Sequence, residues 1–210
     1  MSLLKKININ WIFFLFSLFI FLTIFYLVRS FMTNFDEMDH ISAVYLMSNG
    51  QKLYRDIFAT HFPFPFYWAY LFSPFWVNLS FGKAITNLHF TLAIFYILIF
   101  ISTFFALKKP FFKIIFFVWI LFLSLVFSLY HGNLYLSETF TGVLLSAIFW
   151  ILIPVFIDQQ KLNTHSRTLL IILASLAAWT QPLYALLILI PIILSPSKKI
   201  IKTFLLAFII

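Results

Sequence analysis

The chain has 210 residues, of which 63% are hydrophobic and only 10% are charged, and its mean hydropathy is +1.05. These values exclude an ordinary soluble domain and indicate an integral membrane protein. The net charge of +8 does not indicate nucleic-acid binding, because most Lys and Arg residues lie between apolar runs, as expected for cytoplasmic loops.

Four apolar runs match the length of about 20 residues that a membrane-spanning helix needs. They cover residues 11–31, 84–107, 111–130 and 140–157. No signal-peptide cleavage site follows the first run, so we expect an uncleaved helix whose N-terminus is cytoplasmic. By the positive-inside rule, the basic segments 108–113 and 161–167 are also cytoplasmic, whereas residues 32–82 and 131–137 form outer loops.

The long outer loop is predicted to begin with a short amphipathic helix on the membrane surface. Asn34 followed by Glu37, or Thr33 followed by Asp36, is typical of a helix N-terminus, and Asn49-Gly50 is typical of a C-terminus. The apolar stripe of this helix consists of Met38, Ile41, Val44, Tyr45 and Leu46.

A second interfacial helix is predicted in the aromatic run 66–76. It follows a polar turn at Tyr54-Arg55-Asp56. Between the turn and the helix, Pro63 and Pro65 predict an extended kink.

Residues 168–196 are too long for one straight span, and Thr180-Gln181-Pro182 interrupts them. The basic residues that follow at 198–202 should be cytoplasmic, which favours a re-entrant pair of short helices with Gln181 near the tip. One long helix kinked at Pro182 is the alternative. The apolar run 203–210 lacks a polar end, so we expect residues 1–210 to be a single transmembrane domain truncated at its C-terminus.

Three of the six carboxylates of the chain, Asp36, Glu37 and Asp39, lie within four positions just beyond the first span. Ionisable groups beside a membrane are costly, so their default interpretation is functional. Asp36 and Glu37 are candidate catalytic residues: one as a general base for an acceptor hydroxyl, the other orienting it or binding a divalent cation. The alternative is favourable charge at a helix N-terminus, worth about 0.3–1 kcal/mol.

Other polar residues could join this site. Asp39 and His40 share a helix face with Asp36, which suits either a weak metal site or a solvated surface. Glu138 opens an apolar helix on the same outer face, as a second acidic position or as N-terminal helix charge. Gln181 lies in an apolar stretch and is expected to hydrogen-bond to another helix.

Arg55, Asp56 and His61 cluster between the two loop helices. The fork of Arg55 is well matched to a phosphate group. Pairing of Arg55 with Asp56 inside the turn explains the same residues without a ligand. His61 can equally be an interfacial residue.

The order of these motifs resembles the N-terminal half of the GT-C membrane glycosyltransferases. The most similar members are the dolichyl-phosphate-mannose–protein mannosyltransferase-like and aminoarabinose-transferase-like enzymes. The segments that carry the resemblance are Phe35-Asp36-Glu37, Leu53-Tyr54-Arg55-Asp56, His61 before a Pro-aromatic run, Ser137-Glu138-Thr139 and Ala178-Trp179-Thr180-Gln181-Pro182.

The resemblance implies a polytopic all-α GT-C fold that transfers a sugar from a polyprenyl-phosphate donor. The acceptor would be a glycan, lipid or protein on the outer face of the inner or plasma membrane. Asp36 would be the catalytic base, and Glu37 and Glu138 would assist it or hold a divalent metal. Arg55 would bind the donor phosphate, and Gln181 would contact substrate.

Two departures from the family bear on donor binding. Phe62 replaces the Lys usual beside the His, and the Lys usual after Thr180 is absent. If those lysines bind phosphate in relatives, then Lys52, Arg55 or His61 must substitute here, or donor binding is weakened.

Two other functions remain open. A solute or lipid transporter predicts polar residues deep inside several spans, and apart from Gln181 the spans offer almost none. A non-catalytic membrane subunit predicts that Asp36→Asn and Glu37→Gln leave function intact.

Overall fold

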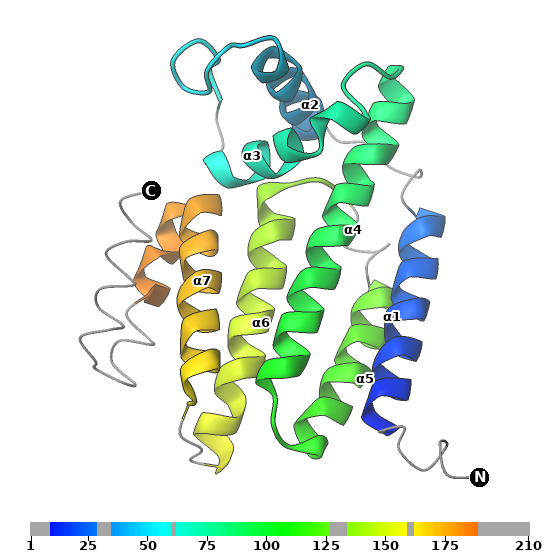
Figure 1. The fold of residues 1–210 in the computed structure, drawn as a ribbon, viewed down its shortest axis with the longest axis vertical. Coiled ribbons are helices and arrows are strands. Elements are labelled where there is room, and N and C mark those ends of the chain that lie inside the picture. Colours follow the sequence, from blue (N-terminus) through cyan, green and yellow to red (C-terminus); the bar gives the residue numbers. More distant parts are fainter. Residues whose placement is uncertain (1–8, 29–34, 60–61, 127–133, 159–161, 189–210) are drawn as a thin grey trace.

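The computed structural model describes residues 9–28, 35–59, 62–126, 134–158 and 162–188 (Figure 1). Within these ranges the regular structure is helical, so the expected all-α fold is confirmed for this part of the chain. The elements are α1 (Ile9–Val28), α2 (Phe35–Ser48), α3 (Pro63–Leu71), the 3-10 turn η2 (Ser73–Phe75), α4 (Phe81–Ala106), α5 (Pro110–Val126), α6 (Ser137–Asp158), α7 (Thr164–Thr180) and the 3-10 helix η3 (Pro182–Ile188).

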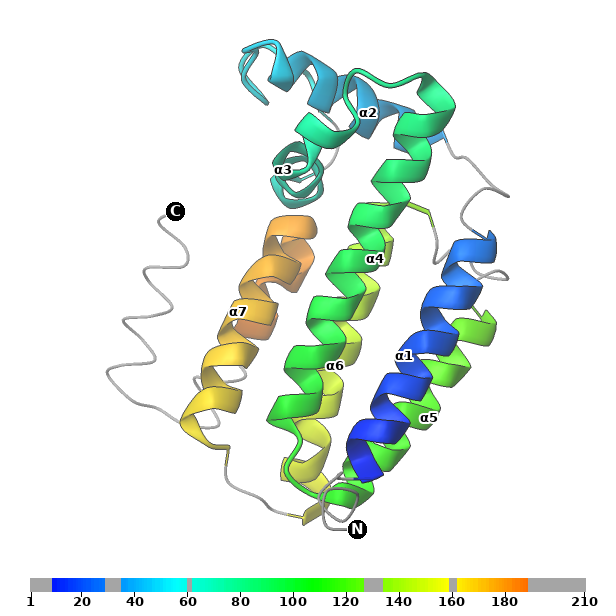
Figure 2. The same ribbon diagram turned by 45° about the vertical axis from the view of Figure 1, so that its right-hand side comes forward.

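Helices α1, α4, α5, α6 and α7 run side by side as a bundle, and α2 and α3 lie across one end of it (Figures 1 and 2). In the bundle α1 packs on α5, α4 on α6, and α6 on α7. Helices α2 and α3 pack on each other, and both contact α4. We call this the α2–α3 end; α4 and α6 begin there, and α7 ends there.

Two of the described helices, α4 and α6, are long and apolar enough to cross a membrane. Their 26 and 22 residues give lengths of about 39 Å and 33 Å, against a hydrocarbon core of about 30 Å. The described apolar parts of α1 and α5, Trp11–Leu27 and Pro110–Ser124, are shorter. The ends of the predicted runs 11–31 and 111–130 lie outside the described residues.

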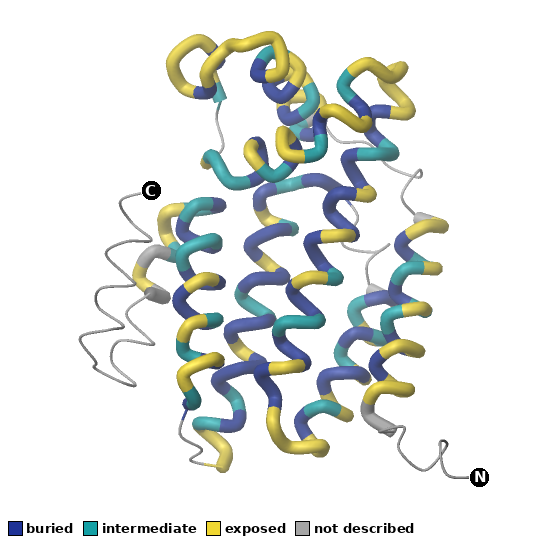
Figure 3. The backbone as a smooth tube through the Cα atoms, in the orientation of Figure 1, coloured by how far each residue is buried: buried dark blue, intermediate teal, exposed yellow. Residues whose placement is uncertain are grey.

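Phenylalanine rings fill much of the space between the bundle helices. Phe14 of α1 stacks on Phe104 of α4 with ring centroids 4.7 Å apart, and Phe21 meets Phe100 edge-on at 5.2 Å. Such pairs add about 0.5–1.5 kcal/mol to the area that each ring buries. Figure 3 shows the result: the buried residues lie along the inner faces of the helices, and the exposed ones lie outside.

Helix α2 buries a different face from the predicted one. Its buried residues recur at helical spacing and are Glu37, His40, Ala43, Val44 and Met47. Of the predicted apolar stripe, Val44 is buried, but Met38 and Tyr45 are exposed. The prediction was wrong because it counted apolar residues only, whereas α2 packs through a face whose polar side chains find partners inside the protein.

The predicted end of α2 at Asn49-Gly50 is confirmed. Gly50 has a φ of +89°, and its N–H donates to the Met47 carbonyl at 3.0 Å. The N–H of Gln51 donates to the Leu46 carbonyl at 3.1 Å. This pair of bonds is the Schellman motif, which satisfies the last carbonyls of a helix.

Pro63 and Pro65 lie inside α3 rather than in an extended segment before it. Phe62 is the extended N-cap residue, with φ −72° and ψ 161°, and Pro63 is the first residue of the helix. Proline suits this position because its missing N–H would have no helical partner there. The second loop helix therefore begins earlier than the predicted run 66–76.

Helix α7 ends where the sequence predicts an interruption. Gln181 is extended, with φ −148° and ψ 121°, and η3 then packs back against α7 (Figure 1). The described chain therefore breaks at Gln181 and does not continue as a single helix kinked at Pro182, whereas the re-entrant pair over 168–196 stays a prediction. Residues 189–196 and the run 203–210 lie outside the described residues.

Replacing Gly50 with Ala should destabilise the protein by about 1–2 kcal/mol, because a Cβ is unfavourable at a left-handed φ. No atom lies within 4 Å of the added Cβ, so the loss reports backbone strain alone. Gly142→Ala in α6 is the control; it is equally free of contacts and should be neutral or stabilising by up to about 1 kcal/mol. Denaturant unfolding in detergent measures the stability of both variants. An equal change in the free energy of unfolding would contradict the left-handed conformation of Gly50.

Candidate functional site

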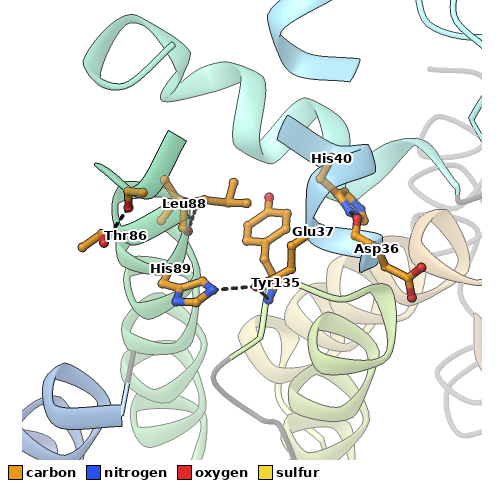
Figure 4. Close-up of polar contacts among 9 residues, drawn as sticks. Asp36, Glu37, His40, Thr86, Leu88, His89 and Tyr135 are labelled. Atoms are coloured by element: carbon orange, nitrogen blue, oxygen red, sulfur yellow. Dashed lines mark hydrogen bonds and ion pairs between the residues drawn. The ribbon is translucent and has the colours of Figure 1, made fainter. Parts of the chain in front are cut away.

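Glu37 lies in the first turn of α2 and is completely buried (Figure 4). Its Oε1 accepts a hydrogen bond from His89 Nε2 of α4 at 2.5 Å and another from the Tyr135 backbone N–H at 2.6 Å. His89 and Tyr135 are also fully buried. We call these three residues the Glu37 junction, because they join α2 to α4 and to the segment that leads into α6.

Further contacts surround the junction and include α3. The His40 Nδ1–H donates to the Asp36 carbonyl at 2.8 Å, and the His40 ring stacks on Phe66 of α3 at 4.5 Å. The Tyr135 hydroxyl donates to the Pro65 carbonyl at 2.7 Å. Burial raises the pKa of Tyr135 well above its usual value, so the phenol remains a hydrogen-bond donor.

Asp36 precedes Glu37 and is only partly buried. In Figure 4 its carboxylate points away from the Glu37 junction. Successive side chains on an α-helix point about 100° apart, since there are 3.6 residues per turn. The two neighbouring carboxylates therefore differ in environment: one is bonded inside the protein, and the other reaches solvent at the α2–α3 end.

Glu138 and Gln181 meet at the same end of the bundle. Glu138 lies in the first turn of α6, and Gln181 directly follows α7. The Gln181 Nε2 donates to Glu138 Oε1 at 3.3 Å. The prediction that Gln181 hydrogen-bonds to another helix is confirmed, and its partner is the second predicted acidic residue.

Arg55 and Asp56 pair with each other in an exposed turn. Two guanidinium nitrogens of Arg55 donate to the two Asp56 oxygens at 2.8 and 2.7 Å, and the Lys52 backbone N–H adds a third bond at 2.8 Å. The Arg55 hydrogen bonds lower the pKa of Asp56 to about 2. Internal pairing thus accounts for both residues. The Lys52 side chain is exposed, and His61 lies outside the described residues.

The described residues bring no group of three His, Asp or Glu side chains into a position to hold a metal ion. The metal site suggested by the spacing of Asp36, Asp39 and His40 is therefore not formed. Asp39 is exposed, whereas His40 is buried against Phe66 on another face of α2. The alternative metal ligands Glu37 and Glu138 are engaged by His89 and Gln181 respectively.

Two hollows flank α2. The first has a volume of about 240 Å³ and lies between α2, the segment 57–59 and Phe66 of α3; Asp39 and Ser42 line it on the α2 side. The second has a volume of about 410 Å³ and lies between α2, the residues around η2 and the start of α4. Its lining is mostly apolar and includes Tyr45 and Trp76.

His89 and Tyr135 are the two junction residues that the sequence interpretation did not single out. His89 lies inside the apolar run 84–107, and an ionisable side chain in such a run is a signal that could have identified it. Tyr135 contributes its backbone N–H, which no pattern of side chains reveals.

Comparison with known proteins identifies no relative of the chain. No protein-family model matches the chain, and neither the curated proteins nor the solved structures give a match. The chemistry of the site is therefore interpreted from its residues and their geometry.

Replacing either side chain of the buried pair should be strongly destabilising. Glu37→Ala and His89→Ala should each cost about 3–5 kcal/mol, because each strands a buried polar or charged partner. The double variant should cost less than the sum of the two. Lys109 and Asp158 pair at 2.6 Å in an exposed setting and serve as the control cycle, with a coupling of about 0–1 kcal/mol. Denaturant unfolding measures these free energies. Additive losses of stability for Glu37→Ala and His89→Ala would contradict a direct interaction between the two side chains.

The Arg55–Asp56 turn should contribute stability that depends on pH. Because the folded-state pKa of Asp56 is depressed from 3.8 to about 2, the contribution is full above pH 3.8 and is lost as the pH falls through about 2. The difference in thermal midpoint between the wild type and Asp56→Asn should follow this course. A difference that persists unchanged at the acid limit would show that the Asp56 charge is not responsible.

Proposed function

We propose that the protein is a membrane glycosyltransferase of the GT-C class. It would transfer a sugar from a polyprenyl-phosphate donor to an acceptor on the outer face of the membrane. The observation that carries the proposal is that the neighbouring side chains of Asp36 and Glu37 point into different environments. The Glu37 carboxylate is buried and anchors α2, whereas the neighbouring Asp36 carboxylate is presented to solvent. The Asp-Glu pair resembles the motif of this class.

The outward faces of the bundle helices support insertion of several helices into a membrane. Each helix carries large apolar side chains that are exposed: Phe16 and Phe19 of α1, Ile94 and Leu98 of α4, Ile114 and Val118 of α5, Phe149 and Phe156 of α6, and Ile172 of α7. Apolar surface of this extent is rare on soluble monomers and suits contact with acyl chains. The α2–α3 end would then lie at the outer interface, with the N-terminus in the cytoplasm.

In the proposed reaction Asp36 acts as the general base. It accepts the proton of an acceptor hydroxyl while the hydroxyl oxygen bonds to the anomeric carbon of the donor sugar. The bond between that carbon and the phosphate oxygen breaks, and polyprenyl phosphate leaves with the electron pair. Glu37 is a positioning residue in this scheme, because its bonds to α4 and to Tyr135 fix the turn that carries Asp36.

Glu138 and Gln181 would bind donor or acceptor hydroxyls at the same end of the bundle. The leaving phosphate requires a cation, and among the described residues Lys52, Arg55 and Lys83 are the basic side chains near this end. Arg55 already pairs with Asp56, so it would have to share its fork with the phosphate. His61 keeps its proposed role in donor binding, as does Lys52.

Asp36→Asn should reduce sugar transfer by about 10²-fold or more, because the amide cannot accept the acceptor proton. The thermal midpoint should be unchanged, since the Asp36 backbone carbonyl is the group that bonds to His40. Asp158→Asn, at the opposite end of the bundle, is the matched control and should retain full transfer. The assay follows labelled sugar from a polyprenyl-phosphate donor into membrane acceptors. Undiminished transfer by Asp36→Asn would refute its role as the base and favour a non-catalytic subunit.

A further inference from the structure

We propose that the hollow of about 240 Å³ beside α2 is an acceptor subsite that holds one sugar ring through Asp39 and Ser42. This inference rests on the proposed glycosyltransferase function and deepens it. It assigns the acceptor, rather than the donor, to this side of α2.

The first argument is position. Asp39 lies three residues after Asp36, so the backbone positions of the two residues are about 4.5 Å apart along the helix axis and are neighbours on its surface. Asp36 points away from the Glu37 junction (Figure 4), and the hollow begins at Asp39. A ring seated in the hollow would therefore place a hydroxyl near the proposed base.

The second argument is the chemistry of the lining. Asp39 and Ser42 of α2 offer hydrogen-bonding groups, and Ala43 of the same helix, Ile57 and Phe66 offer apolar surface. A sugar ring presents the same combination, with hydroxyls at its edge and C–H groups on its faces. Small-molecule sites generally combine a mostly apolar lining with a few polar groups that fix orientation.

The volume and the charge of the hollow restrict the kind of ligand that it can bind. The volume is below the roughly 300–1,000 Å³ typical of sites for drug-sized ligands, which suits a single ring. Phe58 at the rim is 93% exposed, so one face of its ring is available to stack on a sugar. The Asp39 carboxylate would repel the donor phosphate, and this repulsion favours a neutral acceptor sugar.

The test measures binding of simple sugars to the full chain in detergent, independently of transfer. The probes are glucose, mannose, galactose and N-acetylglucosamine, detected by saturation-transfer NMR and ranked by competition. Asp39→Asn and Ser42→Ala should each weaken binding about tenfold, the effect of losing one hydrogen bond to the ligand. Both positions are exposed, so neither substitution should impair folding. Tyr45→Ala, on the same helix but in the apolar hollow, is the matched control and should bind sugars normally.

A transfer assay on the same variants separates this inference from the proposed function. Asp39→Asn should raise the acceptor KM about tenfold and leave the donor KM unchanged, whereas Asp36→Asn should lower kcat and leave sugar binding intact. Binding that depends on Asp39 without any transfer by the wild type would overturn the proposed function and leave the sugar site standing. Transfer with no sugar binding, or with binding that Asp39→Asn does not weaken, would overturn the subsite alone.

Discussion

Burying the Glu37 carboxyl group is unfavourable unless it is hydrogen-bonded, and two separate elements supply the bonds: the imidazole of His89 and the backbone N–H of Tyr135. Because both bonds converge on one oxygen, the first turn of α2 can occupy only one place on the bundle. The hydrogen bond from Tyr135 to the Pro65 carbonyl extends the same constraint to α3. The arrangement of the α2–α3 end therefore depends on this carboxylate.

The position of the candidate site follows from that constraint and from helix geometry. With Glu37 directed into the protein, Asp36 must leave the helix on a different side. Asp39 follows three residues later and is therefore a neighbour of Asp36 on the helix surface. Glu138 and Gln181 reach the same end because α6 begins there and α7 ends there. Residues far apart in the sequence thus lie at the same end of the bundle because of the directions in which the helices run. The packing between these helices is otherwise apolar.

The sequence predicts most helices correctly, because apolar runs of membrane length and a Gly after an amphipathic segment are strong local signals. It fails where tertiary partners decide the outcome. Glu37 and His40 belong to the buried face of α2 only because His89, Tyr135 and Phe66 satisfy or cover them. No pattern local to α2 contains that information. Pro63 was misplaced for a different reason: a proline that disrupts a helix interior is favourable in its first turn.

The sequence separation of the junction residues has a consequence for biosynthesis. His89 and Tyr135 lie 52 and 98 residues after Glu37. At roughly 5–20 residues per second, the ribosome needs about 5–20 s after Glu37 to complete its set of partners. During that interval α2 has been made but lacks part of its docking site, and the ionisable side chain of Glu37 favours keeping this turn in water until then. Closure of the α2–α3 end would thus be a late step of assembly, timed by synthesis of the segment before α6.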